Sequence, residues 1–395
     1  MLRDQKNEAN RLTKPFKIVW GRELTMIDVK KQLLEDLNQL KLDNSVLQPN
    51  TTYDNRKYQQ PEMIIIGLEK DCTIYKRTFI KYQFIQLKKR SISKKFESWI
   101  GYDDFNGDLI QVHLCLCGRK ADQCDAMENF MNNRAKKVSS KNRFSFRCPS
   151  IAVIGSDGSG KSTVTTDLEK WFSKKLDCRR YYLGSGDHYN PIYKQGLRTI
   201  VRWFGRSRSS NEQQAVNTGK SQLKKTPDRV LKKGLKKGYC HLNAFYLYRI
   251  SVHSLKQLKK SNDFSKNGGI SLFDRFPQNQ FMGINDGPKI RKAYGTINSP
   301  IINCLMQMEE KNIGRCVKMS PGLVIKLIVS PEIAVTRKPD HSILELERKA
   351  DIIHTLSFRD AVIHNVDASQ QYDIELKAIK KLIWNYLFQC SKTNG

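Results

Sequence analysis

Apolar and polar positions alternate in two different ways along this chain, and the change comes at Pro149. Beyond it, residues 151–154 are wholly apolar, a pattern typical of a strand that is buried on both faces of a sheet. Comparable runs predict further strands at 181–183, 270–273, 323–329 and 362–366. Between the strands, apolar residues recur at helical spacing, notably in 242–258, 333–336 and 374–387. Strands that alternate with helices predict a parallel sheet with helices on both faces.

Before Pro149 the pattern is less regular and predicts a small α+β domain. Residues 1–60 are polar and only partly helical, with one amphipathic patch at 27–40. In residues 61–133, short apolar strings alternate with basic turns, which predicts strands at 63–66 and 110–117 and a turn at 104–107.

The composition of the segments between these elements sets the other boundaries. We expect a basic linker at 134–147, which leads into an α/β domain over 148–395. Between about 184 and 238 this domain carries a basic segment that reads as an insertion.

Composition and charge narrow the class of protein. Hydrophobic residues make up 39% of the 395 positions and charged residues 27%, as in folded globular chains. No apolar run approaches the roughly 18 residues of a membrane span, and residues 1–6 are too charged for a secretory signal. We therefore expect a cytoplasmic protein, with peripheral attachment to a membrane as an open alternative. Lys and Arg outnumber Asp and Glu by 69 to 39, so at least one anionic partner is expected.

The ten cysteines are too dispersed for a disulfide scaffold, but one cluster of them is a candidate metal site. His113 lies close to Cys115, Cys117 and Cys124, which could in principle hold zinc. However, residues 112–117 alternate like a strand and no CxxC pair occurs, which favours a strand that carries small buried thiols.

The strongest motif follows the apolar run at 151–154 and fits the pattern G-x-x-x-x-G-K-[ST]. A helix is expected after it, with Val164, Leu168, Trp171 and Phe172 on one side. Glycines let the backbone turn its N–H groups toward phosphate oxygens, and the helix N-terminus adds a favourable dipole. The motif predicts a nucleoside triphosphate site with the residues Gly155, Ser156, Asp157, Gly158, Ser159, Gly160, Lys161, Ser162 and Thr163.

Within that site the side chains have separate expected roles. Lys161 is placed to reach the β- and γ-phosphates, and the Ser162 hydroxyl is placed to ligate Mg²⁺. A second carboxylate should come from another strand end, and Asp274, which ends the run at 270–273, supplies it for Mg²⁺ through a water. Arg275 follows it and can clamp a second phosphate. Capping of the strand end by this Asp–Arg pair is the alternative.

Together, Asp157 in the loop and Asp274-Arg275-Phe276 resemble the motifs of the thymidylate kinases. The resemblance covers about 148–395 and implies a P-loop NTPase fold, ATP with Mg²⁺ as donor, and a nucleoside monophosphate as acceptor. It implies that Asp157 contacts the acceptor sugar and that Arg275 binds the acceptor phosphate. It also implies that Arg249 lines the acceptor cleft, that residues 366–369 flank the adenine, and that two lid residues meet the transferring phosphoryl group, Arg337 and Lys338.

Three further segments resemble a narrower group, the thymidylate kinase-like proteins of bacterial surface-polysaccharide loci, in residues 275–278, 285–288 and 337–341. That group carries an N-terminal nucleotidyltransferase-like domain, which residues 99–114 resemble in part. A metal-binding D-x-D is replaced here by Asp71-Cys72-Thr73. Loss of one carboxylate weakens two-metal chemistry, so we expect the N-terminal domain to be non-catalytic.

The sequence leaves the acceptor open. Transfer to a phosphate needs no general base, whereas transfer to a nucleoside or other alcohol needs a carboxylate within hydrogen-bond reach. Asp187, just beyond the strand predicted at 181–183, could be that base or a simple turn residue. The insertion at 184–238 and the sequence after Phe276 depart from ordinary thymidylate kinases, so thymidylate itself is not established.

A third alternative belongs to another class, a P-loop ATPase associated with nucleic acid or membrane. Residues 179–238 hold 15 Lys or Arg and only three acidic residues, a density that suits phosphate backbones or an anionic bilayer. No stacking-aromatic motif or recognition module accompanies the charge, and an ordinary basic surface is the favoured interpretation. A homodimer is a further open alternative.

Overall fold

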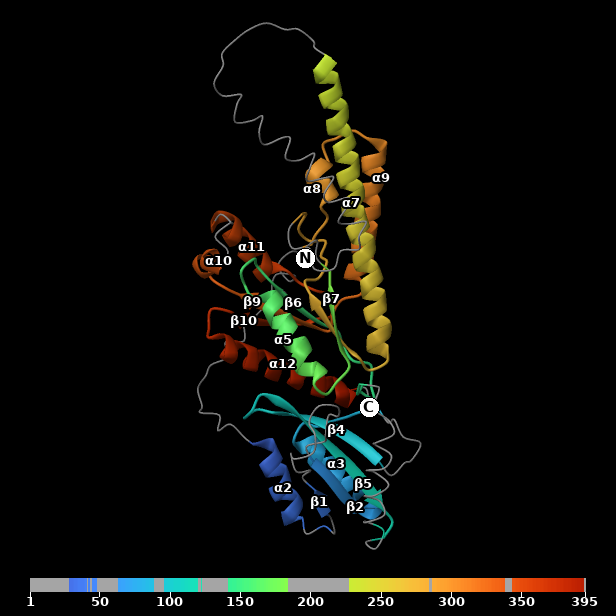
Figure 1. Cartoon of the computed structure of the whole chain (residues 1–395), viewed down its shortest axis with the longest axis vertical. Helices are drawn as coiled ribbons and strands as arrows, with labels where there is room; N and C mark the ends of the chain where they lie inside the picture. The colour runs from blue at the N-terminus through green and yellow to red at the C-terminus, as the bar shows by residue number, and fades with distance from the viewer. Residues whose placement is uncertain are drawn as a thin grey trace, which may run out of the picture.

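The computed structural model describes residues 28–40, 42, 45–47, 63–88, 96–119, 122, 141–183, 227–283, 286–337 and 343–393. These residues form two five-stranded sheets that lie one beyond the other along the long axis of the molecule (Figure 1). One sheet is built from residues before 120 and the other from residues after 150.

The C-terminal sheet is parallel throughout, with the strand order β10-β9-β6-β8-β7. Its strands are β6 (Ile151–Gly155), β7 (Cys178–Tyr182), β8 (Ile270–Asp274), β9 (Leu323–Ile328) and β10 (Val362–Asp367). Four of them lie where the apolar runs predicted them, whereas β7 begins three residues before the run predicted at 181–183. The central strand, β6, is apolar from Ile151 to Ile154 because both of its faces are buried. Ile151 and Val153 face one hydrophobic cluster, and Ala152 and Ile154 face another.

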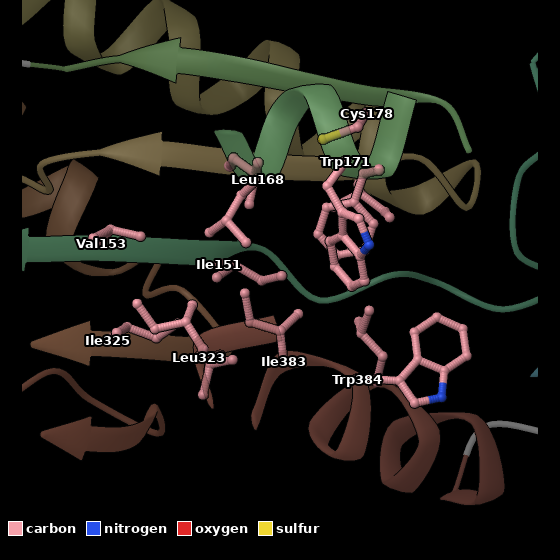
Figure 2. Close-up of a cluster of buried hydrophobic side chains, with 14 of the residues drawn as sticks. Ile151, Val153, Leu168, Trp171, Cys178, Leu323, Ile325, Ile383 and Trp384 are labelled. Carbon is pink, nitrogen blue, oxygen red and sulfur yellow. The ribbon is translucent and has the colours of Figure 1, made fainter. Parts of the chain in front are cut away.

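Helices cover both faces of this sheet, as the sequence predicts. On one face α5 (Lys161–Ser173) and α12 (Tyr372–Thr393) enclose a core that includes Leu168, Trp171, Ile383 and Trp384 (Figure 2). On the other face the core contains residues of α7 (Pro227–Lys266), α9 (Pro300–Val317) and α11 (Ile343–Thr355). The shorter α8 (Ile290–Tyr294) and α10 (Pro331–Arg337) complete the domain. The architecture is that of a P-loop NTPase fold.

Helix α7 is longer than the periodic stretch 242–258 that predicts it. It runs through residues 227–238, which the sequence assigned to the basic insertion, and it continues to Lys266. In Figure 1 it stands beside α9 for much of its length. Ala244 of α7 packs with Ile290, Tyr294, Ile302 and Met306, so α8 and α9 support the part of α7 that projects beyond the sheet.

The N-terminal sheet has the order β1-β2-β5-β4-β3, with β2 and β5 parallel and the other neighbours antiparallel. Its elements are β1 (Ser45–Leu47), β2 (Met63–Leu68), β3 (Ile85–Gln86), β4 (Phe96–Asp103), β5 (Asp108–Cys117), α2 (Val29–Gln39), the 3-10 turn η1 (Glu69–Asp71) and α3 (Cys72–Lys81). Leu33 and Leu37 of α2 share a core with Phe79 of α3 and Trp99 of β4. The packing therefore joins part of the region 1–60 to the domain predicted at 61–133.

Strand β5 carries His113, Cys115 and Cys117, three of the four residues weighed as a metal site, and Cys124 lies outside the described residues. Cys115 and Cys117 are buried, and burial raises the pKa of the Cys115 thiol to about 12. The ring nitrogens of His113 lie 2.8 Å from the Ser98 hydroxyl and 3.3 Å from the Gln111 amide. These residues form the strand with buried thiols that the alternation favoured.

The two sheets share one continuous core rather than a flexible joint. Ile100 and Tyr102 of the N-terminal sheet belong to the same cluster as Trp171 and Trp384, and the Tyr102 and Trp171 rings meet edge to face at 5.8 Å. The Trp384 indole donates to the Gln83 carbonyl at 3.1 Å. Trp171 lies ten residues after Lys161 on α5, about 15 Å along the helix axis. The N-terminal unit is thus docked away from the phosphate loop.

Part of the predicted basic linker takes part in this contact. Phe144 pairs with Leu87 of the N-terminal unit, and Asn142 pairs with Leu176 beyond α5. Phe144 and Phe146 are buried in the shared core. Residues 141–147 therefore pack between the two units instead of spanning solvent. Within the described ranges, no helix is both long and apolar enough to cross a bilayer.

Lys326 offers a test of how this core is built. The side chain sits on β9 with 3% exposure, its ammonium donates to the His354 carbonyl at 2.9 Å, and burial lowers its pKa to about 8. In the unfolded chain Lys326 keeps its proton up to about pH 10.5, whereas in the folded protein it loses the proton above about pH 8. The buried charge therefore destabilises the fold fully below pH 8, and this destabilisation disappears as the pH rises toward 10.5. Lys326→Met should therefore match or exceed the native Tm at pH 7.

The measurement is thermal unfolding from pH 7 to pH 10.5. The advantage of Lys326→Met over the native protein should shrink across that window, whereas Lys318→Met, at an exposed position, should show no such trend. A large loss of Tm at pH 7 in Lys326→Met would show that the hydrogen bond to His354 outweighs the desolvation cost.

Candidate nucleotide site

The phosphate loop connects β6 to α5 at the carboxyl end of the sheet. Gly158 and Gly160 have φ angles of 84° and 85°, in the left-handed region that favours glycine. A Cβ on Gly158 would lie 2.8 Å from the Ala334 carbonyl oxygen, so α10 closes over the loop at that point. The first turn of α5 follows at once, which brings its N-terminal dipole to the same place.

Hydrogen bonds hold the loop in a cradle. The Ser159 hydroxyl donates to the Ser156 carbonyl at 2.9 Å, and the Lys161 ammonium donates to the same carbonyl. Lys161 is 7% exposed, whereas Ser162 and Thr163 are exposed on the first turn of α5. Lys161 therefore folds back over the loop, and its contact with the β- and γ-phosphates stays a prediction.

Asp274 ends β8, the strand next to β6, and pairs in register with Val153. Its carboxyl group is 2% exposed, and its Oδ1 has no hydrogen-bond partner in the described part of the chain. A buried carboxylate oxygen without a partner is costly, so its presence indicates a position that a ligand can complete.

Arg275 lies beside Asp274 and turns toward the phosphate loop. Its φ of 72° is in the left-handed region, which is unusual for a residue with a side chain. The guanidinium lies 3.5 Å from Asp157 Oδ1 and 3.9 Å from Asp286 Oδ2. Asp157 and Arg275, which the sequence placed together at the acceptor, are in contact.

Asp157 is surrounded by positive charge. Its Oδ2 accepts a hydrogen bond of 2.9 Å from Lys349 of α11, and Lys161 and Arg275 lie nearby. Burial alone would raise the pKa of this carboxyl, but the Lys349 bond and the two other cations outweigh it and lower the pKa to about 2. Asp157 is therefore ionised at any working pH.

Arg337 connects the loop to the C-terminal end of the sheet. One guanidinium nitrogen donates to the Gly158 carbonyl at 3.4 Å and another donates to the Ala368 carbonyl at 3.1 Å. Residues 366–369, predicted to flank the adenine, thus lie next to the phosphate loop. Lys338 and Asp187 lie outside the described residues.

A small hollow of about 20 Å³ lies between α7, α9 and the loop before α8. Its α7 lining consists of Leu247, Ile250, Ser251 and Ser254, and Arg249 is not part of this lining. Arg249 is half-buried on α7. Its place in the acceptor cleft stays a prediction.

Three residues in or beside the site were assigned no role from the sequence: Lys349, Asp286 and Lys289. Asp286 drew attention only as part of the segment 285–288. Lys349 lies on a helix that was not predicted, and its distance from Asp157 along the chain gives no local signal. Lys289 is one of many lysines in a strongly basic chain. Only the fold brings these three charges to the loop.

The parallel sheet, its glycine-rich strand-to-helix loop, and the carboxylate on the neighbouring strand define a P-loop NTPase. The chain is 30% identical over 238 residues to the uncharacterized ATP-binding protein YghR of Escherichia coli strain K12, an alignment that covers 59% of this chain and 86% of YghR. It is 28% identical over 237 residues to the uncharacterized ATP-binding protein YghS, covering 59% and 91%. The chain belongs to the family of YghR.

Among solved structures, matches include deoxyadenosine kinase from M. mycoides with bound dATP, at 15% identity and a TM-score of 0.32, covering 60% of this chain and 98% of that one. The same enzyme with products dCMP and a flexible dCDP gives 15% identity, a TM-score of 0.34, and coverage of 59% and 98%. TM-scores this low support no inference about this chain's substrate. No family model matches the chain.

Proposed function

We propose that the protein is an ATP-dependent kinase that transfers a phosphoryl group to a nucleoside monophosphate, as thymidylate kinases do. The observation that carries the proposal is the position of Arg275, which follows the end of β8 beside the phosphate loop and lies 3.5 Å from Asp157. In the thymidylate kinases that the motif resembles, an Arg at this place binds the acceptor phosphate, which is the role that we assign to Arg275. The similarity to ATP-binding proteins supports ATP as the phosphoryl donor.

On the donor side, the loop amides and Lys161 would receive the β- and γ-phosphates. Arg337 lies against Gly158 and Ala368, so it would reach the phosphates from the side of α10. Both cations stand ready before any ligand arrives, and the site stabilises developing charge with little reorganisation.

Magnesium fits the residues that are present. Asp274 offers a buried Oδ1 without a hydrogen-bond partner, and Ser162 offers an exposed hydroxyl at the start of α5. Oxygen ligands of this kind, one carboxylate and one hydroxyl together with phosphate oxygens, suit Mg²⁺. The ion would neutralise charge on the phosphates, while Asp274 and Ser162 would fix its place.

On the acceptor side, Asp157 would accept hydrogen bonds from the sugar and Arg275 would bind the phosphate. The attacking oxygen of a monophosphate is already anionic, so these residues need only position it in line with the donor. Asp157 remains charged because of its lowered pKa, and it cannot donate a proton to the acceptor at neutral pH.

A second candidate, a kinase of nucleosides or other alcohols, draws support from Asp274. The same unpartnered Oδ1 that suits a metal-bound water could accept a proton from a hydroxyl. Acceptor screening separates the two candidates directly.

The test measures ADP formation by purified protein with ATP and Mg²⁺, alone and with each acceptor in turn. Nucleoside monophosphates should raise the rate by at least about tenfold over the hydrolysis background, and nucleosides or polyols should not. Stimulation by nucleosides alone would move the assignment to the alcohol kinase. Stimulation by DNA or RNA ends with a steep dependence on salt would instead favour a nucleic-acid enzyme.

A further inference from the structure

One buried carboxylate, Asp286, stands between two cations at the acceptor side of the site. It lies in the loop between β8 and α8, and its side chain is 8% exposed. Its Oδ2 lies 3.9 Å from the Arg275 guanidinium, and its Oδ1 lies 3.6 Å from the Lys289 ammonium. Both distances exceed the 2.7–3.2 Å of a direct hydrogen bond. At these distances Asp286 attracts both cations by charge, without a direct hydrogen bond to either.

Buried polar groups lie along the chain on both sides of Asp286. Before Asp286, the Gln278 side chain is 1% exposed and its Oε1 accepts hydrogen bonds from the amides of Gln280 and Phe281. After it, the buried Glu309 carboxylate of α9 accepts the Ile290 amide at 2.9 Å and the Lys289 amide at 3.2 Å. Satisfied buried networks of this kind rigidify their surroundings.

Asp286 also marks the point where two hollows meet. One is lined by Gly155 and Lys161 of the phosphate loop together with Arg275, and the other by Leu247 and Ile250 of α7 together with Lys289. Asp286 lines both of them. An acceptor that reached the donor phosphates from the side of α7 would pass this position with its own charged end.

Charge balance explains why a second cation is needed there. Arg275 faces Asp157 as well as Asp286, and Asp157 is also bound by Lys349. A phosphate monoester carries close to two negative charges at neutral pH. Lys289, which faces Asp286 and the buried Glu309, supplies a further positive charge on the far side of Asp286.

We propose that Lys289 is a second phosphate-binding residue of the acceptor site, and that Asp286 is the positioning residue that holds Lys289 and Arg275 on either side of the acceptor's monophosphate group. This inference rests on the proposed function and specifies its substrate class, because the pair recognises the phosphate of the acceptor rather than its sugar or base.

Lys289→Met tests the first part, with Lys292→Met as the matched control, since Lys292 lies one turn further on and is exposed. With thymidylate or another active monophosphate as the varied substrate, Lys289→Met should raise the acceptor KM at least about tenfold, the scale expected for a lost charge-assisted hydrogen bond. The ATP KM and Tm should stay within experimental spread of Lys292→Met, and Lys289→Arg should restore most of the acceptor affinity.

Asp286→Asn tests the second part without disturbing the backbone, because Asn tolerates the φ of 62° at this position. It should lower kcat/KM for the monophosphate about tenfold with ATP binding unchanged, and Asp286→Glu should recover part of the loss. A purely structural role would instead lower Tm and affect both substrates equally.

The outcomes separate this inference from the function on which it rests. A native protein that phosphorylates no monophosphate overturns the proposed function. A native protein that does so, with a Lys289→Met variant that behaves like Lys292→Met, overturns only the role of Lys289. Equal losses for ATP and acceptor in Asp286→Asn overturn its role as a positioning residue.

Discussion

Lys161→Ala should lower kcat by at least about 10³-fold and leave the fold intact. Loss of a single preorganised donor at developing charge costs on the order of 10²–10³-fold, and Lys161 supplies a full charge as well as a donor. The loop itself should persist, because the Ser156 carbonyl that accepts from Lys161 also accepts from the Ser159 hydroxyl and amide. Alanine is moreover the best helix former at the first position of α5.

The matched control is Lys170→Ala, which removes an exposed lysine from the same helix, where it pairs only with Asp167 across one turn. Steady-state ADP formation measures the loss, and thermal unfolding of both variants measures the fold. Exposed ion pairs contribute about 0–1 kcal/mol, so Lys170→Ala should remain active and folded. Residual activity of Lys161→Ala above a tenth of native would show that the loop does not bind the transferred phosphates as proposed.

Local signals sufficed for the C-terminal sheet and for the loop. A strand buried on both faces must be apolar at every position, so the local sequence from Ile151 to Ile154 is enough to predict β6. The glycines at 158 and 160 likewise predict a local feature, because the backbone there has the left-handed conformation that favours glycine. Because these signals are local, the order of strand, glycine-rich motif and helix along the sequence was enough to predict the fold class.

Other features depend on contacts between distant residues, and the sequence does not show them locally. Helix α9 buries Glu309 and Asn312 along with its apolar residues, which interrupts the apolar periodicity that would predict it. Glu309 is buried there only because the amides of the loop before α8 bind it. The shared core of the two sheets depends similarly on Tyr102 meeting Trp171, residues that look like ordinary members of separate domains.

The contacts of the basic residues also change the meaning of the net charge. Several cations that contribute to the +30 are paired within the fold, for example Lys381 with Asp104 and Arg143 with Asp177. Others, such as Lys349 and Arg275, are committed to Asp157 at the site. A positive composition therefore does not by itself indicate a nucleic-acid surface, because part of it builds the interface and the phosphate site.

The second large effect is expected for Arg275→Ala, which should act on the acceptor and spare the donor. Removal of the guanidinium leaves Asp157 and Asp286 facing the acceptor phosphate with one cation fewer between them. Truncation of one member of a close charge network costs about 2–5 kcal/mol, so kcat/KM for the monophosphate should fall on the order of 10²–10³-fold. The backbone should tolerate the change, because alanine and arginine meet the same penalty at a φ of 72°.

Two measurements test whether Arg275 acts on the acceptor rather than on ATP. Steady-state kinetics with the monophosphate varied should show a higher KM and a lower kcat, while equilibrium binding of ATP should change less than about threefold. Arg359→Ala, which removes an exposed arginine that forms an ion pair with the neighbouring Asp360, is the control. Arg275→Lys should recover only part of the loss, since an ammonium keeps the charge but not the planar fork that binds two phosphate oxygens. If ATP affinity fell as much as acceptor affinity, Arg275 would belong to the donor site, and the assignment of a phosphorylated acceptor would lose the observation that carries it.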